Sequence, residues 1–264
     1  MSVTIFIPAR YASSRYPGKP LAMLTGATGE AKSLVRRSWD AAMRVKGATR
    51  VAVATDDGRI ADAARAFGAE VAMTSSEARN GTERCAEAAA GGTAEIIVNL
   101  QGDAPLTPPW FVEALIEEMQ ADPTCMMATP VLKCDAEALA GFQADRKAGR
   151  VGGTTAVFNA NRDAIYFSKE VLPYTAEDWA GGATPEVWHH VGVYAYRPAA
   201  LAAYMSWPEG LLEAREGLEQ LRFIENGMPV RCVAVEARGA AFWELNNPED
   251  VARIEAILAA TGAP

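Results

Sequence analysis

Short apolar segments alternate with amphipathic segments through the first 120 residues. Residues 3–8, 50–55, 70–74 and 95–100 are short, mostly apolar runs, which predicts buried strands. Helices are predicted between and after these strands, with Ser33 placed to cap the first, over residues 33–44, 60–67, 82–90 and 110–120. Strands and helices that alternate at this spacing predict an α/β fold, with a mainly parallel sheet covered by helices on both faces.

The second half of the chain loses this rhythm. Strands are predicted over residues 126–132, 154–158, 191–196 and 230–235, and helices over residues 201–205, 212–226 and 251–260. The last helix begins at the run NPED, residues 247–250, with Pro248 at its first position. Because no linker or internal repeat interrupts the pattern, we predict one domain, residues 1–264, whose sheet is mixed rather than purely parallel.

The overall charge narrows the possible partners. The net charge is −8 and no lysine- or arginine-rich run is present, so we expect no nucleic-acid partner. An anionic substrate must therefore be held by a few well-placed cations. No apolar run reaches the roughly 20 residues of a membrane span, and no signal peptide precedes the first strand. The four cysteines form no CxxC pair, as expected in a reducing compartment, so we expect a cytoplasmic protein without a membrane partner.

The loop after the first strand carries the strongest chemical signal. Residues 7–21 read IPARYASSRYPGKPL, with Arg10, Arg15 and Lys19 and little opposing charge. Ligands bind at the carboxyl ends of strands in open α/β sheets, so this loop is predicted to lie at the binding edge, with residues 55–58, 75–82 and 101–108 beside it. Three cations and exposed amides suit a triphosphate, although a solvated basic loop is the alternative. The loop matches neither GxxxxGK[ST] nor GxGxxG.

A carboxylate follows the fourth predicted strand. Residues 100–105 read LQGDAP and place Asp103 just beyond the buried run. Mg²⁺ needs only one or two carboxylates when phosphates and waters complete its coordination, so Asp103 is a candidate magnesium ligand. The alternative is an aspartate in an ordinary turn.

These segments resemble the CMP-Kdo synthetases (3-deoxy-manno-octulosonate cytidylyltransferases). The basic loop, residues 79–84 (RNGTER) and residues 100–105 are similar to that family's amino-terminal motifs. Residues 190–197 (HVGVYAYR), 218–222 (LEQLR) and 247–250 are similar to its later motifs, in the same order. The resemblance implies a nucleotide-diphospho-sugar transferase (Rossmann-like) fold, a homodimer, and transfer of CMP from CTP to an acidic sugar with release of pyrophosphate.

The resemblance also implies roles for single residues. Residues 1–125 would bind the nucleotide, and residues 126–264 the sugar and a second subunit. Arg10, Lys19 and Asp103 would be catalytic, and Asp103 would hold Mg²⁺ with Asn246. The predicted nucleotide-binding residues are Pro8, Ala9, Arg10, Arg15, Lys19, Asn80, Gly81, Thr82 and Gln101. The predicted sugar-binding residues are Gln101, Lys169, His190, Tyr194, Glu216 and Gln220.

Some of these residues also have structural explanations. His190 could be a satisfied histidine beside a strand, Tyr194 a core side chain, and Glu216 and Gln220 part of a solvated helix face.

Several positions depart from the family pattern. Asn246 stands where the family has an aspartate two residues before proline, with Glu244 nearby as a possible substitute. Thr155 falls at a usual lysine, His189 at a usual arginine, and Lys169 at another arginine. Ala104 replaces an acid. These changes leave open a different acidic acceptor, or a degenerate homologue that binds nucleotide without catalysis.

Overall fold

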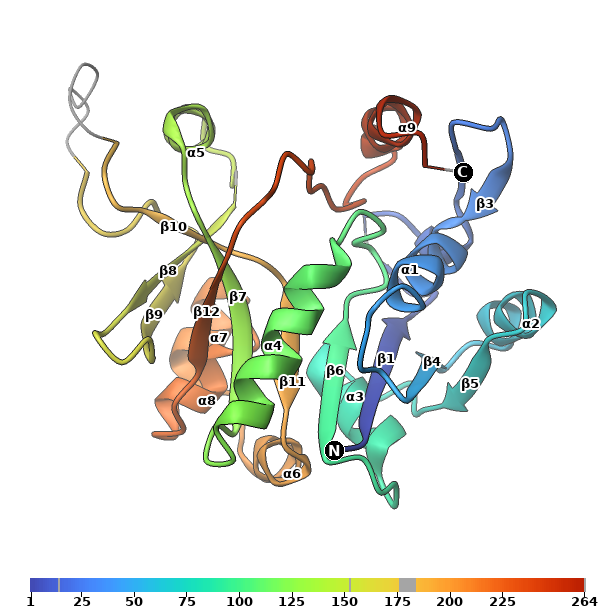
Figure 1. The fold of residues 1–264 in the computed structure, drawn as a ribbon, viewed down its shortest axis with the longest axis horizontal. Coiled ribbons are helices and arrows are strands. Elements are labelled where there is room, and N and C mark those ends of the chain that lie inside the picture. Colours follow the sequence, from blue (N-terminus) through green and yellow to red (C-terminus); the bar gives the residue numbers. More distant parts are fainter. Residues whose placement is uncertain (14, 152, 176–183, 264) are drawn as a thin grey trace.

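The computed structural model describes residues 1–13, 15–151, 153–175 and 184–263. Its centre is β1 (Val3–Ala9), in which every residue is buried. On one side β1 pairs in parallel with β4 (Arg50–Thr55), which pairs in parallel with β5 (Glu70–Met73). On the other side it pairs in parallel with β6 (Ile96–Leu100) (Figure 1). The parallel strands predicted for the first half are therefore confirmed.

Helices cover both faces of this parallel region, as predicted. Apolar side chains of α1 (Leu34–Ala42), α2 (Gly58–Ala66) and α4 (Pro109–Ala121) pack against one face. The other face packs against α3 (Gly81–Ala89) and α6 (Pro198–Ser206). Alternate residues of β1 serve the two layers: Ile5 and Ile7 lie in the first core, whereas Phe6 lies in the second.

The sheet continues into the second half through antiparallel strands. Next to β6 lies β11 (Val193–Tyr196), followed by β7 (Met127–Lys133) and β10 (Trp188–His190). The far edge is formed by β8 (Thr154–Phe158) and β9 (Ala164–Ser168), while β12 (Arg231–Val235) pairs in parallel with β7. This order places the second half directly against the carboxyl end of β6.

The predicted helix over residues 212–226 is wrong. The structure has two short helices instead, α7 (Leu211–Glu216) and α8 (Leu221–Glu225). Gly217 ends α7 in the left-handed conformation, with φ 63° and ψ 37°. Glycine adopts this conformation without a steric penalty, so it stops the helix even though apolar residues continue at helical spacing beyond it.

Other boundaries also differ from the sequence prediction. The strand predicted over residues 191–196 is confirmed only over β11, and an unpredicted strand, β10, precedes it with Val191 and Gly192 between the two. The helix α5 (Ala136–Lys147) was not predicted at all. The last helix, α9, spans Asp250–Ala260, so Pro248 precedes it rather than opening it. The Asp250 carboxylate instead accepts the backbone N–H groups of Asn246 and Asn247, at 2.9 and 2.7 Å.

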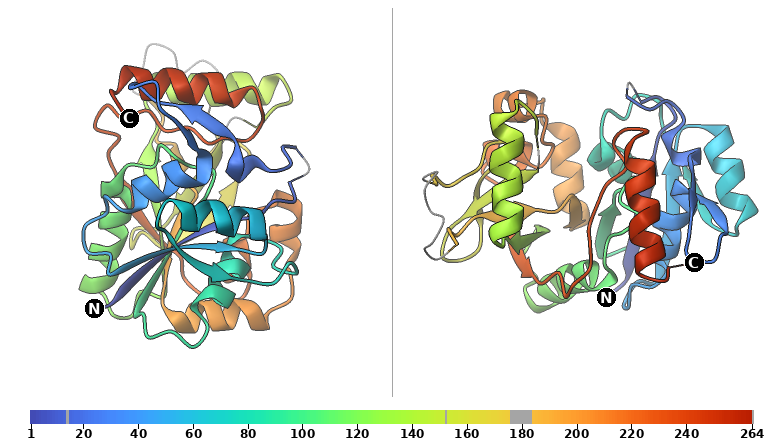
Figure 2. Two further views of the ribbon diagram at one scale, coloured as in Figure 1. Left: turned by 90° about the vertical axis from the view of Figure 1, so that its right-hand side faces the viewer. Right: turned by 90° about the horizontal axis from the view of Figure 1, so that it is seen from above.

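The carboxyl-terminal segment returns to the amino-terminal loop. A hairpin of β2 (Met23–Thr25) and β3 (Ala31–Ser33) packs beside α9, as two views show (Figure 2). Leu24 of β2 and Ile254 and Leu258 of α9 form a separate core with Leu34 of α1 and Leu245. This contact brings residues 244–247 beside the basic loop. No helix among the described residues is both long and apolar enough to cross a membrane.

Two glycine substitutions should change stability in opposite directions. Gly217→Ala places a side chain at positive φ and should lower the free energy of unfolding by about 1–2 kcal/mol. Gly141→Ala lies in the exposed part of α5 with no atom within 4 Å of the new Cβ, so it should raise that energy by about 0.5–1 kcal/mol. Urea denaturation of both variants measures the effects, and equal shifts would contradict this account of the helix end.

Candidate active site

The carboxyl ends of β1 and β6 open into a cavity of about 490 Å³. This volume lies within the range of small-molecule sites. Among the described residues, 55–58 do not line it, so only three of the four predicted loops contribute. The predicted site residues that line it are Pro8, Ala9, Arg10, Arg15, Lys19, Asn80, Gly81, Gln101, Asp103, Tyr194 and Gln220.

The basic loop is closed on itself and presents its cations to the cavity. The N–H group of Gly18 donates to the Tyr11 carbonyl at 2.9 Å, which holds the loop together. Arg10 donates from Nη1 to the Arg79 carbonyl at 3.2 Å, so one of the predicted cations also ties this loop to the β5–α3 turn. Lys19 Nζ lies 2.6 Å from Asp103 Oδ2. The predicted cations and the predicted metal-binding carboxylate therefore meet in one place.

The turn before α3 exposes its backbone rather than its side chains. Asn80 caps the helix, because its Oδ1 accepts the Glu83 N–H at 2.8 Å, and its Nδ2 donates to the Tyr204 hydroxyl at 2.8 Å. Thr82 is buried, and its hydroxyl lies 2.8 Å from that of Tyr196. The side chains of Asn80 and Thr82 are thus engaged inside the protein. What remains toward the cavity is the backbone at Asn80 and Gly81.

Glycine is required at two close approaches in this region. A Cβ at Gly81 would lie 2.7 Å from Nε2 of Gln101, and a Cβ at Gly102 would lie 2.5 Å from the Pro8 carbonyl oxygen. Side chains at either position would push the loops apart. The glycines therefore allow the loops after β1, β5 and β6 to share one cavity wall.

Oxygen ligands gather beside Lys19. The N–H of Leu245 donates to the Asp103 carbonyl at 2.8 Å, which holds residues 244–246 against the end of β6. Asn246 Oδ1 accepts a hydrogen bond from Arg15 Nη2 at 3.2 Å. Burial, and secondarily the negative charge of Asp103, raise the pKa of Glu244 to about 7. The described residues contain no group of three or more His, Cys, Asp or Glu side chains that could hold a metal.

Tyr194 and Gln220 form the inner wall. The Tyr194 hydroxyl donates to Gln220 Oε1 at 3.0 Å, and both side chains are buried. Gln220 Nε2 makes no hydrogen bond with another described residue. A buried amide N–H without a protein acceptor is costly unless a ligand or water takes it, so Gln220 is well placed to donate to a bound molecule.

Three predicted sugar-binding residues do not line the cavity. His190 is buried, with Nε2 3.0 Å from the Thr129 hydroxyl, and burial lowers its pKa to about 3. Glu216 accepts the Ser168 hydroxyl at 2.7 Å and the Lys169 N–H at 3.0 Å, which anchors β9. Lys169 Nζ points toward Gly217, at the cavity edge. Of the predicted sugar-binding residues, Tyr194 and Gln220 therefore lie in the cavity wall, whereas Glu216 has a structural role in holding β9.

Glu219 is a further site residue, which was considered beside Gln220 as a possible polar contact to a sugar but was not included in the predicted sugar-binding set. Its carboxylate lines the cavity and accepts the Thr82 N–H at 3.0 Å and Gln101 Nε2 at 3.2 Å. Burial raises its pKa to about 7. The signal was present in the LEQLR run, but only Gln220 of that run was chosen.

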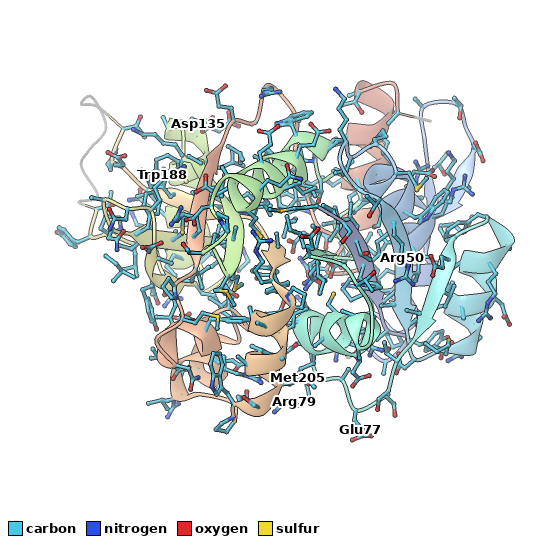
Figure 3. The ribbon with its side chains drawn as sticks, turned by 60° about the horizontal axis from the view of Figure 1, so that its bottom comes forward. Arg50, Glu77, Arg79, Asp135, Trp188 and Met205 are labelled. Atoms are coloured by element: carbon cyan, nitrogen blue, oxygen red, sulfur yellow. The ribbon has the colours of Figure 1, made fainter. Side chains whose placement is uncertain are left out.

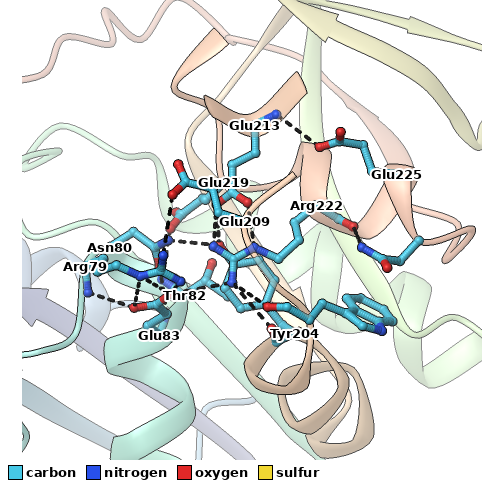
Figure 4. A network of polar contacts seen from close by, with 12 residues as sticks. Arg79, Asn80, Thr82, Glu83, Tyr204, Glu209, Glu213, Glu219, Arg222 and Glu225 are labelled. Carbon is cyan, nitrogen blue, oxygen red and sulfur yellow. Dashed lines mark hydrogen bonds and ion pairs between the residues drawn. The ribbon is translucent and has the colours of Figure 1, made fainter. Parts of the chain in front are cut away.

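A buried ion network supports this wall (Figure 4). Arg222, which is 1% exposed, donates from Nη2 to Glu213 Oε1 at 2.7 Å. The Tyr204 hydroxyl donates to the same oxygen at 2.9 Å and accepts from Asn80. At the surface, Arg79 lies 3.4 Å from Glu209, where the β5–α3 connection approaches the end of α6 (Figure 3). The network joins the turn that caps α3 to the helices α6, α7 and α8.

Comparisons with known proteins identify the family. A family model described as "Cytidylyltransferase" matches residues 4–231. A 3-deoxy-manno-octulosonate cytidylyltransferase of Maricaulis maris (strain MCS10) is 45% identical and covers 99% of both chains. One from Syntrophotalea carbinolica is 38% identical over 98% of this chain and 99% of its own. The chain belongs to the 3-deoxy-manno-octulosonate cytidylyltransferase family.

A solved structure agrees with this assignment. It is titled as CMP:2-keto-3-deoxy-manno-octonic acid synthetase complexed with CTP, and is 34% identical. The match has a TM-score of 0.84 and covers 99% of this chain and 100% of the other. The predicted family, the α/β nucleotidyltransferase fold and the nucleotidyltransferase class are therefore confirmed.

Two departures from the family pattern remove positive charge in the second half. Thr155, at the expected lysine, donates from its hydroxyl to the Glu170 carbonyl at 2.7 Å and accepts the Leu172 N–H at 3.2 Å. His189, at the expected arginine, stacks edge-on against Phe142 with ring centroids 5.1 Å apart. Burial lowers the pKa of His189 to about 4, so this position is neutral at pH 7. Two positive charges expected from the family are therefore absent here.

Glu219→Gln should stabilise the protein at neutral and alkaline pH. The pKa of the Glu219 carboxyl is raised to about 7 in the folded state, from an ordinary value of 4.5. As the pH rises above 4.5, the carboxyl ionises more readily in the unfolded state, so the folded wild-type protein loses stability. The variant should match wild type near pH 4.5 and exceed it increasingly up to pH 8, by up to about 3 kcal/mol. Urea denaturation across pH 4.5–8 measures this difference. A difference that does not change with pH would contradict the burial of an ionisable Glu219.

Proposed function

We propose that this protein transfers CMP from CTP to 3-deoxy-manno-octulosonate, forming the CMP-sugar and releasing pyrophosphate. The observation that carries the proposal is the single cavity in which the basic loop, the glycine-containing turn before α3 and Asp103 come together. The family membership reported above supports the same reaction. The predicted division into a nucleotide half, residues 1–125, and a sugar half, residues 126–264, is retained as part of this proposal.

Charge neutralisation and positioning would supply the catalysis. Arg10, Arg15 and Lys19 would hold the triphosphate, because three fixed cations in a partly enclosed cavity interact with phosphate more strongly than they do in open water. The backbone at Asn80 and Gly81 would receive the cytosine. Holding the acceptor hydroxyl in line with the α-phosphate converts a bimolecular reaction into one between fixed partners.

Cytidylyltransferases of this kind typically use a divalent metal, and we propose Mg²⁺. The donors at the end of β6 fit a hard cation: Asp103 offers a carboxylate and Asn246 an amide oxygen, with no soft ligand beside them. Two protein ligands are enough when phosphate oxygens complete the shell. The bound ion would neutralise negative charge on the α-phosphate during attack.

Side chains from both halves of the chain would meet the acceptor. Gln101, Tyr194 and Gln220 face the cavity and would meet the sugar, with Glu219 beside them. The loss of positive charge at Thr155 and His189 favours a second candidate, a related acidic sugar with different hydroxyl or carboxylate contacts. A homodimer and a cytoplasmic location stay predictions.

A substrate panel tests the reaction. Purified protein with Mg²⁺ should release pyrophosphate from CTP in preference to UTP, ATP and GTP, and only when an acidic sugar is added. Comparing 3-deoxy-manno-octulosonate with N-acetylneuraminate and with neutral sugars separates the two candidates. No pyrophosphate with any acidic sugar, despite CTP binding, would support a non-catalytic homologue.

Lys19→Ala should weaken CTP binding by roughly 10- to 150-fold, because a charge-assisted contact contributes about 1.5–3 kcal/mol. Arg10→Ala should act in the same direction. Lys46→Ala is the matched control, since it removes one exposed charge at the opposite, amino-terminal end of β4. Isothermal titration calorimetry with CTP and Mg²⁺ measures the affinities. Wild-type affinity in both cavity variants would show that the loop is merely solvated.

A further inference from the structure

We propose that Tyr204 is a positioning residue that couples the two substrate sites, so that the nucleotide and the acceptor each bind more tightly when the other is present. The inference rests on the proposed function, because it concerns how that one cavity holds both substrates. Tyr204 lies on α6, is 0% exposed, and is not among the described residues that line the cavity. It must therefore act through its neighbours.

The Tyr204 hydroxyl connects two elements of the cavity wall. It accepts a hydrogen bond from Asn80 Nδ2 at 2.8 Å and donates one to Glu213 Oε1 at 2.9 Å (Figure 4). Burial raises the pKa of the Tyr204 phenol above its ordinary value, so the hydroxyl keeps the proton that it donates. A hydroxyl can accept and donate at the same time, whereas the ring of phenylalanine can do neither. This one oxygen therefore joins the turn before α3 to α7.

Asn80 carries the connection to the turn proposed for the nucleotide. Its Oδ1 caps α3 by accepting the Glu83 N–H at 2.8 Å, while its Nδ2 is held by Tyr204. Because both ends of the amide are engaged, the side chain cannot rotate without losing hydrogen bonds, and Asn80 and Gly81 are held in the cavity lining. The Glu83 carboxylate also lies 3.5 Å from Arg222 Nη1, which ties the start of α3 to α8.

Glu213 carries the connection to the wall proposed for the acceptor. Its carboxylate pairs with Arg222 through Nη2 at 2.7 Å and through Nε at 2.5 Å, which holds α7 and α8 together. Arg222 also stacks on the Tyr204 ring, with the guanidinium carbon 3.9 Å from the ring centroid. Glu219 and Gln220 lie in the short segment between these two helices and line the cavity. A shift of the Tyr204 hydroxyl would therefore change the position of both walls.

A shared network makes the two binding steps depend on each other. A ligand that fixes one wall also restricts the other through the buried hydrogen bonds, so the second ligand loses less freedom when it binds. Such coupling is reciprocal: each ligand raises the affinity for the other by the same factor, commonly about 5- to 150-fold. Buried polar networks are stabilised as a unit, so the loss of one member weakens the rest. Removing the Tyr204 hydroxyl should therefore lower the coupling factor.

Binding of a nucleotide that cannot react tests the proposal. The probe is α,β-methylene-CTP with Mg²⁺, whose carbon bridge prevents release of pyrophosphate. Calorimetric titration with and without saturating 3-deoxy-manno-octulosonate gives the coupling factor. In the wild-type protein the sugar should tighten binding of the analogue by about 5- to 150-fold. Tyr204→Phe should lower this factor roughly 2- to 10-fold, which corresponds to one net hydrogen bond.

Tyr196→Phe is the matched control. It removes another fully buried hydroxyl, which lies 2.8 Å from that of Thr82 on α3 instead of between α3 and α7. It should lower the melting temperature about as much as Tyr204→Phe does and keep the wild-type coupling factor. A wild-type factor in Tyr204→Phe, or an equal fall in Tyr196→Phe, would overturn the proposal.

A double variant tests whether one hydrogen bond carries the effect. Asn80→Ser keeps a residue that can cap α3 but removes the amide that donates to Tyr204. Adding Tyr204→Phe to Asn80→Ser should then lower the coupling factor no further, whereas fully additive losses would contradict the proposal. A wild-type protein that binds both ligands without coupling would also overturn it. Failure of the wild-type protein to bind the analogue, or to bind the sugar in its presence, would instead refute the proposed function.

Discussion

The pairing of β11 with β6 is the constraint on which the site depends. It places Tyr194 opposite Asn99 in the sheet, although the two residues are far apart in sequence. Because β6 ends at the cavity, β11 carries the second half of the chain to the edge where the nucleotide loops already lie. The helices α7 and α8 then close the far side through the Glu213–Arg222 ion pair and the Glu219 contact with Thr82. Without this antiparallel addition, the parallel strands would carry a phosphate-binding loop but no wall for a second substrate.

The cavity balances opposite charges at close range. Arg10, Arg15 and Lys19 come from one loop, whereas Asp103 and Glu219 come from other elements, so these charges meet only in the folded protein. Lys19 forms an ion pair with Asp103. Glu219 and Glu244 are partly buried, and the pKa of each is raised to about 7. Burying such carboxylates costs stability, because water no longer solvates their charge. Bound ligands would offset this cost, because a cation or a sugar hydroxyl supplies the charge or hydrogen-bond donor that the protein does not.

The departures from the family pattern have different physical consequences. Thr155 donates its hydroxyl to the backbone of the segment that follows β9, and His189 packs against an aromatic ring, so both side chains are engaged in local structure. Both positions therefore lack the positive charge that the family pattern has there. Asn246 instead accepts a hydrogen bond from Arg15 through its side chain and donates one to Asp250 from its backbone. The amide at Asn246 lacks the negative charge that the family pattern has at this position.

The sequence by itself determined the parallel half of the fold and the family. Strand and helix periodicity marks β1, β4, β5 and β6 correctly, because each is a short apolar run bounded by turn residues, and the basic loop stands out as an uncompensated group of cations. Tertiary structure alone decided the rest. Gly217 divides one predicted helix into two, since a left-handed residue is invisible to apolar spacing. Whether Glu216 or Glu219 faces the cavity depends on that break, which reorients the chain between them. The neighbourhood of Glu244, Asn246 and Asp103 likewise follows from a backbone hydrogen bond between distant segments, and no local pattern encodes a contact of that kind.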